Sequence, residues 1–131
     1  MGLVIPMKLL LDTHALLWAV TNDSSLSAQA RDAIASENNV VFVSLASLWE
    51  LQIKESIGKI KLPVNFYEEL GPAGFELLPL LLEHIQQLRK LPMHHRDPFD
   101  RMLVAQAQCD QLLLVTRDEE IRKYGLSVLR A

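Results

Sequence analysis

The stretch KLLLDTH at residues 8–14 joins a short apolar run to an aspartate that follows it directly. Residues 8–12 have the composition of a buried β-strand, and residues 15–20 continue with the pattern of a short helix. In open parallel sheets, ligands bind outside the carboxyl ends of the strands. Asp12 therefore stands where a binding site is expected, although an aspartate is also a common helix N-cap.

The alternation of apolar runs and helical periodicity continues along the whole chain and predicts an α/β fold. Further strands are predicted at residues 40–43, 75–78, 112–116 and 127–129. Helices are predicted at residues 27–36, 47–56, 63–70, 83–91, 98–109 and 119–124. Strands that alternate with helices form a parallel sheet with helices on both faces.

Length and composition favour one globular domain over residues 1–131. Half of the residues are apolar and 22% are charged, which is typical of a folded domain. No apolar run reaches the roughly 18 residues of a membrane span, and the first residues lack the features of a secretion signal. Met7 is an alternative start, which would make residues 1–6 an N-terminal extension.

Charge and cysteine content narrow the function further. The formal net charge of -3 argues against nucleic-acid binding by bulk positive charge. Cys109 is the single cysteine, so an internal disulfide is excluded, and a reducing cytoplasm is the expected compartment. Its apolar neighbours predict a small buried side chain at this position.

Further acidic residues follow or begin predicted elements, and each also has a structural interpretation. Glu50 lies three residues after Ser47, as in a capping box. Asp97 precedes a proline and is the expected N-cap of the helix at 98–109, which makes Asp100 the preferred ligand and Asp97 the fallback. Asp118 follows the strand at 112–116 and is a further candidate N-cap. We expect these side chains and Asp12 to meet on one rim of the sheet.

Carboxylates that meet in this way raise one another's pKa values unless a cation lies between them. Ligand sets made only of oxygen favour Mg²⁺ or Mn²⁺ over zinc. The histidines do not show zinc-ligand spacing: His94 and His95 are adjacent and expected in a loop, and His84 is expected on a solvated helix face. His14 is expected at a helix start near the site.

Four stretches of the chain carry a resemblance to a known family. They are KLLLDTHALLW at 8–18, VSLASLWELQIKESIGKIKLP at 43–63, HHRDPFDRMLVAQA at 94–107 and LLLVTRDEEI at 112–121. With these motifs the chain resembles the PIN-domain family, and within it the VapC toxins of type II toxin–antitoxin pairs. The resemblance spans residues 7–129 and implies a three-layer α/β/α sandwich around a parallel sheet of about five strands in the order 3-2-1-4-5.

The resemblance also implies a function and a set of site residues. It makes the acidic quartet Asp12, Glu50, Asp100 and Asp118 the catalytic and metal-binding residues of an endoribonuclease. Asp12 and Asp100 would bind Mg²⁺ or Mn²⁺ most directly, and the other two would complete the site through water or a second ion. A water molecule activated by the metal would hydrolyse RNA and leave a 5′-phosphate without a 2′,3′-cyclic phosphate. A cognate antitoxin, a homodimer and a cytoplasmic location follow from the same resemblance.

Basic residues near the predicted rim are candidates for holding RNA. They are Lys54, Lys59, Lys61, Arg96, Arg101 and Arg117. Lys54 and Arg101 carry most weight, because they lie within about one helical turn of Glu50 and Asp100. For any single one of these residues, a solvated surface charge is the better interpretation.

Three other functions are compatible with the pattern. A PIN-fold nuclease could process RNA without acting as a toxin. A phosphatase of the HAD-like class would need a second aspartate two residues after Asp12, where this chain has His14. A non-catalytic α/β module could bind a partner through apolar residues of the helices at 27–36 and 47–58, but such binding would not require the acidic quartet.

Overall fold

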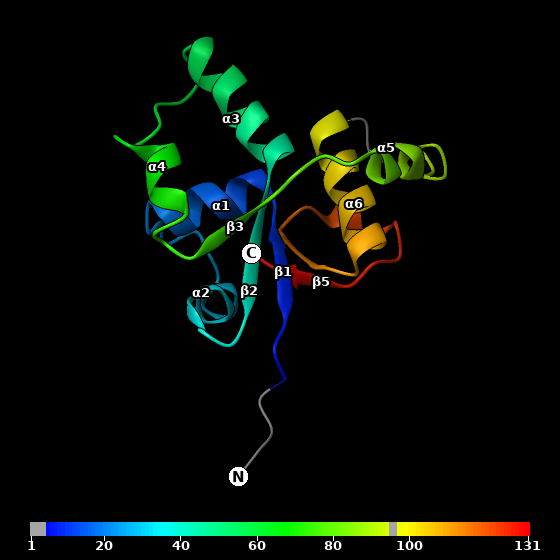
Figure 1. Ribbon diagram of the computed structural model, residues 1–131, viewed down its shortest axis with the longest axis horizontal. Helices are drawn as coiled ribbons and strands as arrows, with labels where there is room; N and C mark the ends of the chain where they lie inside the picture. Colours follow the sequence, from blue (N-terminus) through cyan, green and yellow to red (C-terminus); the bar gives the residue numbers. More distant parts are fainter. Residues whose placement is uncertain (1–4, 95–96) are drawn as a thin grey trace.

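The computed structural model describes residues 5–94 and 97–131. Five parallel strands form its sheet in the order β3-β2-β1-β4-β5, which confirms the predicted topology (Figure 1). The strands are β1 Lys8–Leu11, β2 Val40–Ser44, β3 Phe75–Leu78, β4 Leu113–Thr116 and β5 Val128–Arg130. The helices are α1 Thr13–Val20, α2 Ala28–Ala35, α3 Leu45–Ser56, α4 Phe66–Leu70, α5 Leu82–Leu88, α6 Pro98–Asp110 and α7 Glu119–Arg122.

Side chains of the central strand alternate between two hydrophobic cores, as period-2 geometry requires. Leu9 and Leu11 of β1 face the core that α1, α2, α3 and α4 cover. Leu10 faces the opposite core, to which α6 contributes Leu103 and Val104. Figure 1 shows α1, α2 and α4 on one side of the sheet and α5 and α6 on the other. The predicted three-layer α/β/α sandwich is thus confirmed.

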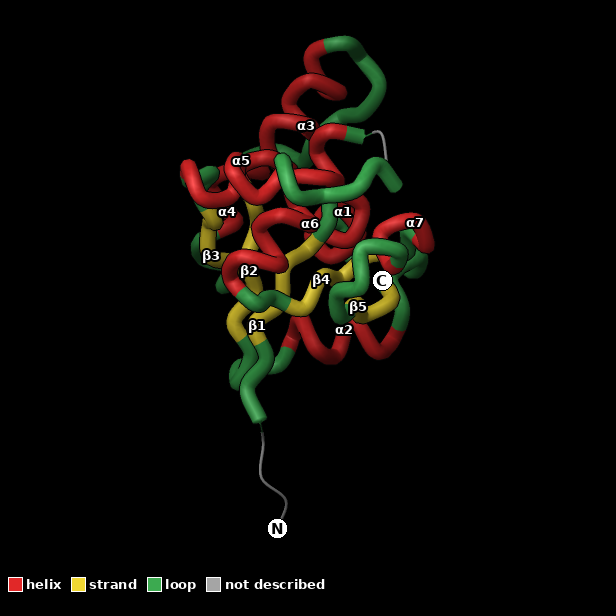
Figure 2. Tube along the Cα trace, turned by 90° about the vertical axis from the view of Figure 1, so that its right-hand side faces the viewer, coloured by secondary structure: helices red, strands yellow, loops and turns green. Residues whose placement is uncertain are grey.

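Strand register brings the carboxyl ends of three strands to one level. Leu11 pairs with Val43 of β2 and with Val115 of β4. The residue after Leu11 continues this alignment, because the Asp12 N–H donates to the Val115 carbonyl at 3.0 Å. In two perpendicular views α3 projects beyond this end of the sheet, opposite the N-terminus (Figure 1, Figure 2). The loops and helix starts at this end therefore surround one rim.

Several predicted helix boundaries were wrong by a few residues, and a side-chain cap or a backbone conformation explains each difference. Helix α3 begins at Leu45 because the Ser44 hydroxyl caps it, accepting the Ala46 N–H at 3.0 Å. Helix α4 begins at Phe66 and not at residue 63, since Asn65 adopts a left-handed conformation with φ +59°.

Among the described helices, none has the length and apolar character that a bilayer crossing requires.

Cys109 was predicted to be a buried apolar side chain, and this prediction was wrong. The thiol is only half-buried and lies 3.7 Å from the Glu83 carbonyl oxygen. Cys109 lies near the carboxyl end of α6, after the buried residues 103–107 of that helix.

Candidate active site

A cavity of about 390 Å³ opens at the carboxyl rim of the sheet and collects all four predicted acids. Residues from α1, α3, the start of α6 and the segment after β4 surround it. Its described lining residues are Asp12, Thr13, His14, Trp18, Glu50, Lys54, Asp97, Asp100, Arg117 and Asp118. Five carboxylates from four separate segments of the chain therefore face one volume.

Asp12 is the most buried of the five carboxylates, with 5% of its surface accessible. Burial raises its pKa above the ordinary value of 3.8, and the negative charge of Asp118 raises it further. Hydrogen bonds with the Thr116 side chain and with the Ala15 N–H, at 2.8 Å, lower the pKa, as does the positive charge of His14. Asp12 is thus a buried carboxylate whose ionised form a nearby cation would stabilise.

Glu50 is held by contacts to two sides of the cavity. The Thr13 hydroxyl donates to Oε1 at 2.5 Å, and Lys54 Nζ lies 3.2 Å from Oε2. The predicted capping box was wrong, because Ser47 lies inside α3 and its hydroxyl has no hydrogen-bond partner among the described residues. Glu50 is only 8% exposed and is directed by Thr13 towards α1 and the cavity.

The remaining acids combine helix capping with a place in the cavity. Asp97 Oδ1 accepts the Phe99 and Asp100 N–H groups at 2.8 and 3.2 Å, so the predicted N-cap of α6 is confirmed. Asp118 Oδ1 caps α7 by accepting the Glu120 N–H at 2.9 Å. Asp100 occupies the third helical position of α6. A cap uses one oxygen of a carboxylate, so capping does not exclude a ligand role.

The basic residues proposed to hold RNA differ in their placement. Lys54 lines the cavity and is partly exposed. Arg117 also lines it, but its guanidinium donates to the carbonyl oxygens of Ala131 and Ser25 and stacks 4.6 Å above the Trp18 ring. These bonds leave Arg117 less able to reorient towards a substrate.

Arg101 is not among the described residues that line the cavity. Its guanidinium donates to the Pro92 carbonyl at 2.9 Å and the Leu88 carbonyl at 3.4 Å, although it follows Asp100 directly. Neighbouring helix residues point in different directions, which explains the separation. Lys59 and Lys61 are exposed beyond the end of α3. Arg96 and His95 lie outside the described residues.

Two threonines were missed by the sequence analysis. Thr13 is buried and bonds Glu50, and Thr116 is buried and bonds Asp12. The Thr116 hydroxyl also accepts the Asp118 N–H at 3.1 Å, so it bridges two acids of the site. Their positions in the sequence could have identified them as partners of the acids. Thr13 follows Asp12 directly, and Thr116 ends the fourth strand two residues before Asp118.

A second group of potential ligands lies on α5 and α6, away from the cavity. In the described part of the chain, Glu83, His84 and Asp110 form a group whose ligand atoms all lie within 4.8 Å of one another. The prediction that His84 lies on a solvated helix face was wrong, since it is completely buried. Its Nδ1 accepts the Leu81 N–H at 3.1 Å, and its Nε2 lies 2.9 Å from Asp110 Oδ2.

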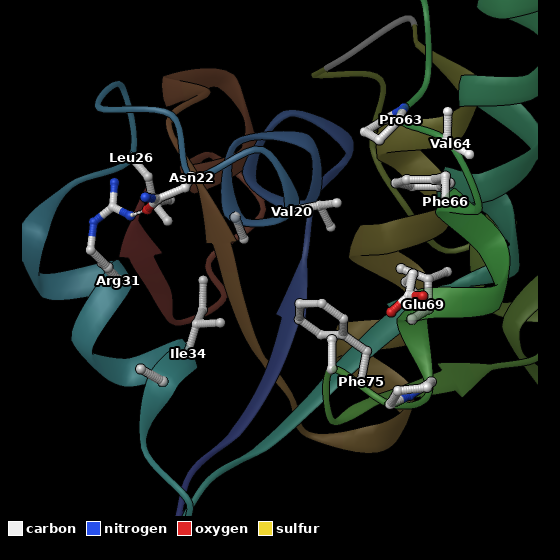
Figure 3. A pocket seen from close by; sticks show the side chains of 15 residues that line it. Val20, Asn22, Leu26, Arg31, Ile34, Pro63, Val64, Phe66, Glu69 and Phe75 are labelled. Atoms are coloured by element: carbon white, nitrogen blue, oxygen red, sulfur yellow. Dashed lines mark hydrogen bonds between the residues drawn. The ribbon is translucent and has the colours of Figure 1, made fainter.

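A larger cavity of about 700 Å³ lies between the α1–α2 region and the α4–β3 region (Figure 3). Its lining is mainly apolar and includes Val20, Ile34, Phe66 and Phe75. Figure 3 shows Arg31 bonded to Asn22 at one end of this cavity. The carboxylate ligands expected from the sequence are not part of its described lining, so its chemistry differs from that of the acidic cavity.

Comparison with known families agrees with the observed fold. The family model of the PIN domain matches residues 9–126. The chain belongs to the PIN domain family. No curated protein matches the sequence significantly.

Solved structures with the same fold include toxin–antitoxin complexes. VapBC2 from Rickettsia felis, solved bound to a DNA fragment from its promoter, has a TM-score of 0.72 at 18% identity, covering 94% of this chain and 98% of that one. A toxin–antitoxin complex from Klebsiella pneumoniae has a TM-score of 0.60 at 18% identity, with 92% and 95% coverage. FitAcB from Neisseria gonorrhoeae has a TM-score of 0.60 at 17% identity, with 93% and 96% coverage. At this level of identity, these likenesses describe the fold.

Proposed function

We propose that the protein is a metal-dependent endoribonuclease that acts as the toxin of a toxin–antitoxin pair. The observation that carries the proposal is the cavity at the carboxyl rim of a PIN fold, with five carboxylates in its lining. Structures with the same fold include a toxin–antitoxin complex and VapBC2 bound to DNA from its promoter, which supports the toxin role.

The residues of the cavity fit a hard divalent cation. The donors are carboxylate oxygens, which Mg²⁺ and Mn²⁺ prefer, and burial of Asp12 together with the charge of Asp118 disfavours its ionised form until a cation is near. Asp12 and Asp100 would hold the ion, and Glu50 and Asp118 would complete the site. When bound, the cation would lower the pKa of a water molecule and neutralise charge on the phosphate.

The chain supports these carboxylates with its own hydrogen bonds. Thr116 and the Ala15 N–H fix Asp12, while Thr13 and Lys54 hold the two oxygens of Glu50. Lys54 is the described cation in the cavity best able to contact a phosphate of the substrate, because its ammonium is partly exposed and flexible. These contacts orient the site before RNA binds.

We propose that the protein acts in the cytoplasm, that it forms a homodimer and that it binds a cognate antitoxin. The 700 Å³ apolar cavity borders α2, one of the two helices whose apolar residues were expected to receive a partner. An antitoxin segment that inserts apolar side chains there would bury surface that the toxin alone leaves open.

The test is to sequence RNA 5′-monophosphate ends after induced expression of the wild type and of Asp100→Asn. We expect new 5′-monophosphate ends and growth arrest with the wild type and neither with Asp100→Asn. Asp32→Asn is the matched control, because Asp32 is an exposed aspartate of α2 outside the cavity lining. It should behave as the wild type.

Two outcomes would overturn parts of the proposal. Products that end in a 2′,3′-cyclic phosphate would rule out hydrolysis by an activated water molecule. Cleavage by the purified protein without growth arrest would instead favour an RNA-processing nuclease that lacks a toxin role.

A further inference from the structure

A pair of aromatic rings joins α3 to α6, two helices that also carry residues of the acidic cavity, and the proposed chemistry does not use it. Trp49 of α3 and Phe99 of α6 meet edge to face, with ring centroids 5.3 Å apart and an interplanar angle of 80°. Each ring belongs to the residue directly before a cavity carboxylate, Glu50 or Asp100. The pair therefore connects α3 with α6 one residue before Glu50 and Asp100, without being part of the described cavity lining.

Trp49 is exposed to an unusual degree for a tryptophan. Its side chain is 61% accessible, whereas large aromatic residues are normally well covered. The other tryptophan, Trp18, is half-buried, stacks with His14 at 5.7 Å and lies under Arg117. Among the described aromatic residues near the cavity, Trp49 thus offers the most open ring, and its edge-to-face contact with Phe99 supports that ring from one side.

In the proposed ribonuclease, a phosphate bound in the cavity would bring the rest of its nucleotide close to α3 and α6. A phosphate held near Glu50 and Asp100 would carry a nucleoside into the neighbourhood of the residues that precede them. Exposed aromatic side chains bind single-stranded nucleic acid by stacking on base faces, and this contact tolerates any base sequence. In a duplex, by contrast, both faces of a base are already stacked, so a paired base offers no face to the indole.

We propose that Trp49, supported by Phe99, is a stacking platform for an unpaired nucleobase next to the scissile phosphate. This inference rests on the proposed ribonuclease function and names one contact that would bind its substrate.

The test uses steady-state cleavage of two short RNA oligonucleotides that share one mapped cleavage site. One carries all its bases, and the other lacks the base beside the scissile phosphate. The variants are Trp49→Ala and Trp49→Phe, with Ile57→Ala as the matched control. Ile57 lies at the distal end of α3 and is 60% exposed, so its truncation removes a similarly exposed apolar side chain away from the cavity.

With intact RNA, Trp49→Ala should raise KM about tenfold with little change in kcat, because stacking of one base accounts for roughly such a factor. Trp49→Phe should recover most of the loss, and Ile57→Ala should match the wild type. The abasic RNA should raise KM for the wild type by a similar factor and should cause no further loss with Trp49→Ala. Such non-additivity is the signature of a direct contact.

Three outcomes would overturn the inference while leaving the ribonuclease function intact. These are an unchanged KM for Trp49→Ala, additive effects of the variant and the missing base, and an equal loss with Ile57→Ala. If KM is unchanged and Trp49→Ala also dissociates a dimer in sedimentation velocity, the exposed ring would be assigned to protein contacts. A wild type that cleaves neither RNA would overturn the proposed function and this inference together.

Discussion

Two groups of acidic residues in this protein look alike in composition but differ in what surrounds them. Glu83, His84 and Asp110 bring their ligand atoms within 4.8 Å of one another, on α5 and α6. The acids of the rim instead line an open volume of about 390 Å³ and come from four segments of the chain. A cation in the first group would compete with the contact between His84 Nε2 and Asp110 Oδ2, whereas the rim offers open volume beside its carboxylates.

The hydrogen bonds of the buried His84 tie the closer group into the fold. Its Nδ1 accepts the Leu81 N–H and so carries no proton. The ring proton therefore lies on Nε2 and is donated to Asp110. A metal at Nε2 would have to displace this proton and this bond, which tie the start of α5 to the end of α6. The rim carboxylates also accept hydrogen bonds, but they adjoin an open volume of about 390 Å³.

The largest expected difference between the two groups is in catalysis. Asp12→Asn should lower kcat/KM for RNA cleavage by at least about 100-fold, because a direct ligand matters more than the outer contacts whose loss costs roughly 10- to 100-fold. Asparagine caps helices as well as aspartate does, so the α1 start should survive. Asp110→Asn should stay within about threefold of the wild type. The opposite ranking in a cleavage assay with Mn²⁺ would place the active centre on α5 and α6.

Stability should show the reverse pattern. His84→Ala should lower the free energy of unfolding by about 1–3 kcal/mol, since it leaves the Leu81 N–H and the Asp110 carboxylate without their partner. His94→Ala, at an exposed loop residue, is the control and should change stability less. Urea unfolding followed by circular dichroism measures both. Equal stability of His84→Ala and the wild type would contradict a structural role for the buried imidazole.

The pH dependence of stability should show that ionisation of Asp12 destabilises the metal-free folded state. Its raised pKa means that the native state binds a proton more tightly than the unfolded state. Stability should therefore fall as pH rises from the ordinary value of 3.8 through the raised pKa, and the penalty should persist above it. Without metal at neutral pH, Asp12→Asn should be more stable than the wild type, and this advantage should vanish below the ordinary pKa. An Asp12→Asn protein that is less stable than the wild type at neutral pH would contradict this.

The smallest effect concerns RNA binding. Lys54→Met should weaken RNA affinity a few-fold and reduce the dependence of log affinity on log salt by about one unit, as expected for loss of one phosphate contact. Arg101→Met should change the slope less, because its guanidinium is bonded to the Pro92 and Leu88 carbonyls. Fluorescence anisotropy across a salt series gives both slopes. A larger slope change for Arg101→Met would show that this side chain turns towards RNA.

Local patterns were enough to predict the sheet and the rim acids. The run before Asp12 and the run before Asp118 are strands, and parallel register then aligns their ends. Asp97 and Asp100 both line the cavity, so the preference for Asp100 as the ligand stays a prediction. Capping and cavity lining use the same position at a helix start, so sequence alone cannot separate them.

Features that depend on distant partners were not predictable in the same way. His84 looked solvated because its partner Asp110 lies 26 residues away. Ser47 fitted a capping box, but Ser44, at the end of β2, is the residue that caps α3. The contact of Trp49 with Phe99 likewise joins two helices that are 50 residues apart in the chain. Local periodicity carries no information on such pairs.

Calorimetric titration of the RNA-free protein with Mn²⁺ tests the central claim most directly. We expect binding by the wild type and an equal affinity for Asp110→Asn. Asp12→Asn should bind at least about tenfold more weakly. Loss of binding in Asp110→Asn together with unchanged binding in Asp12→Asn would contradict the assignment of the metal to the rim cavity.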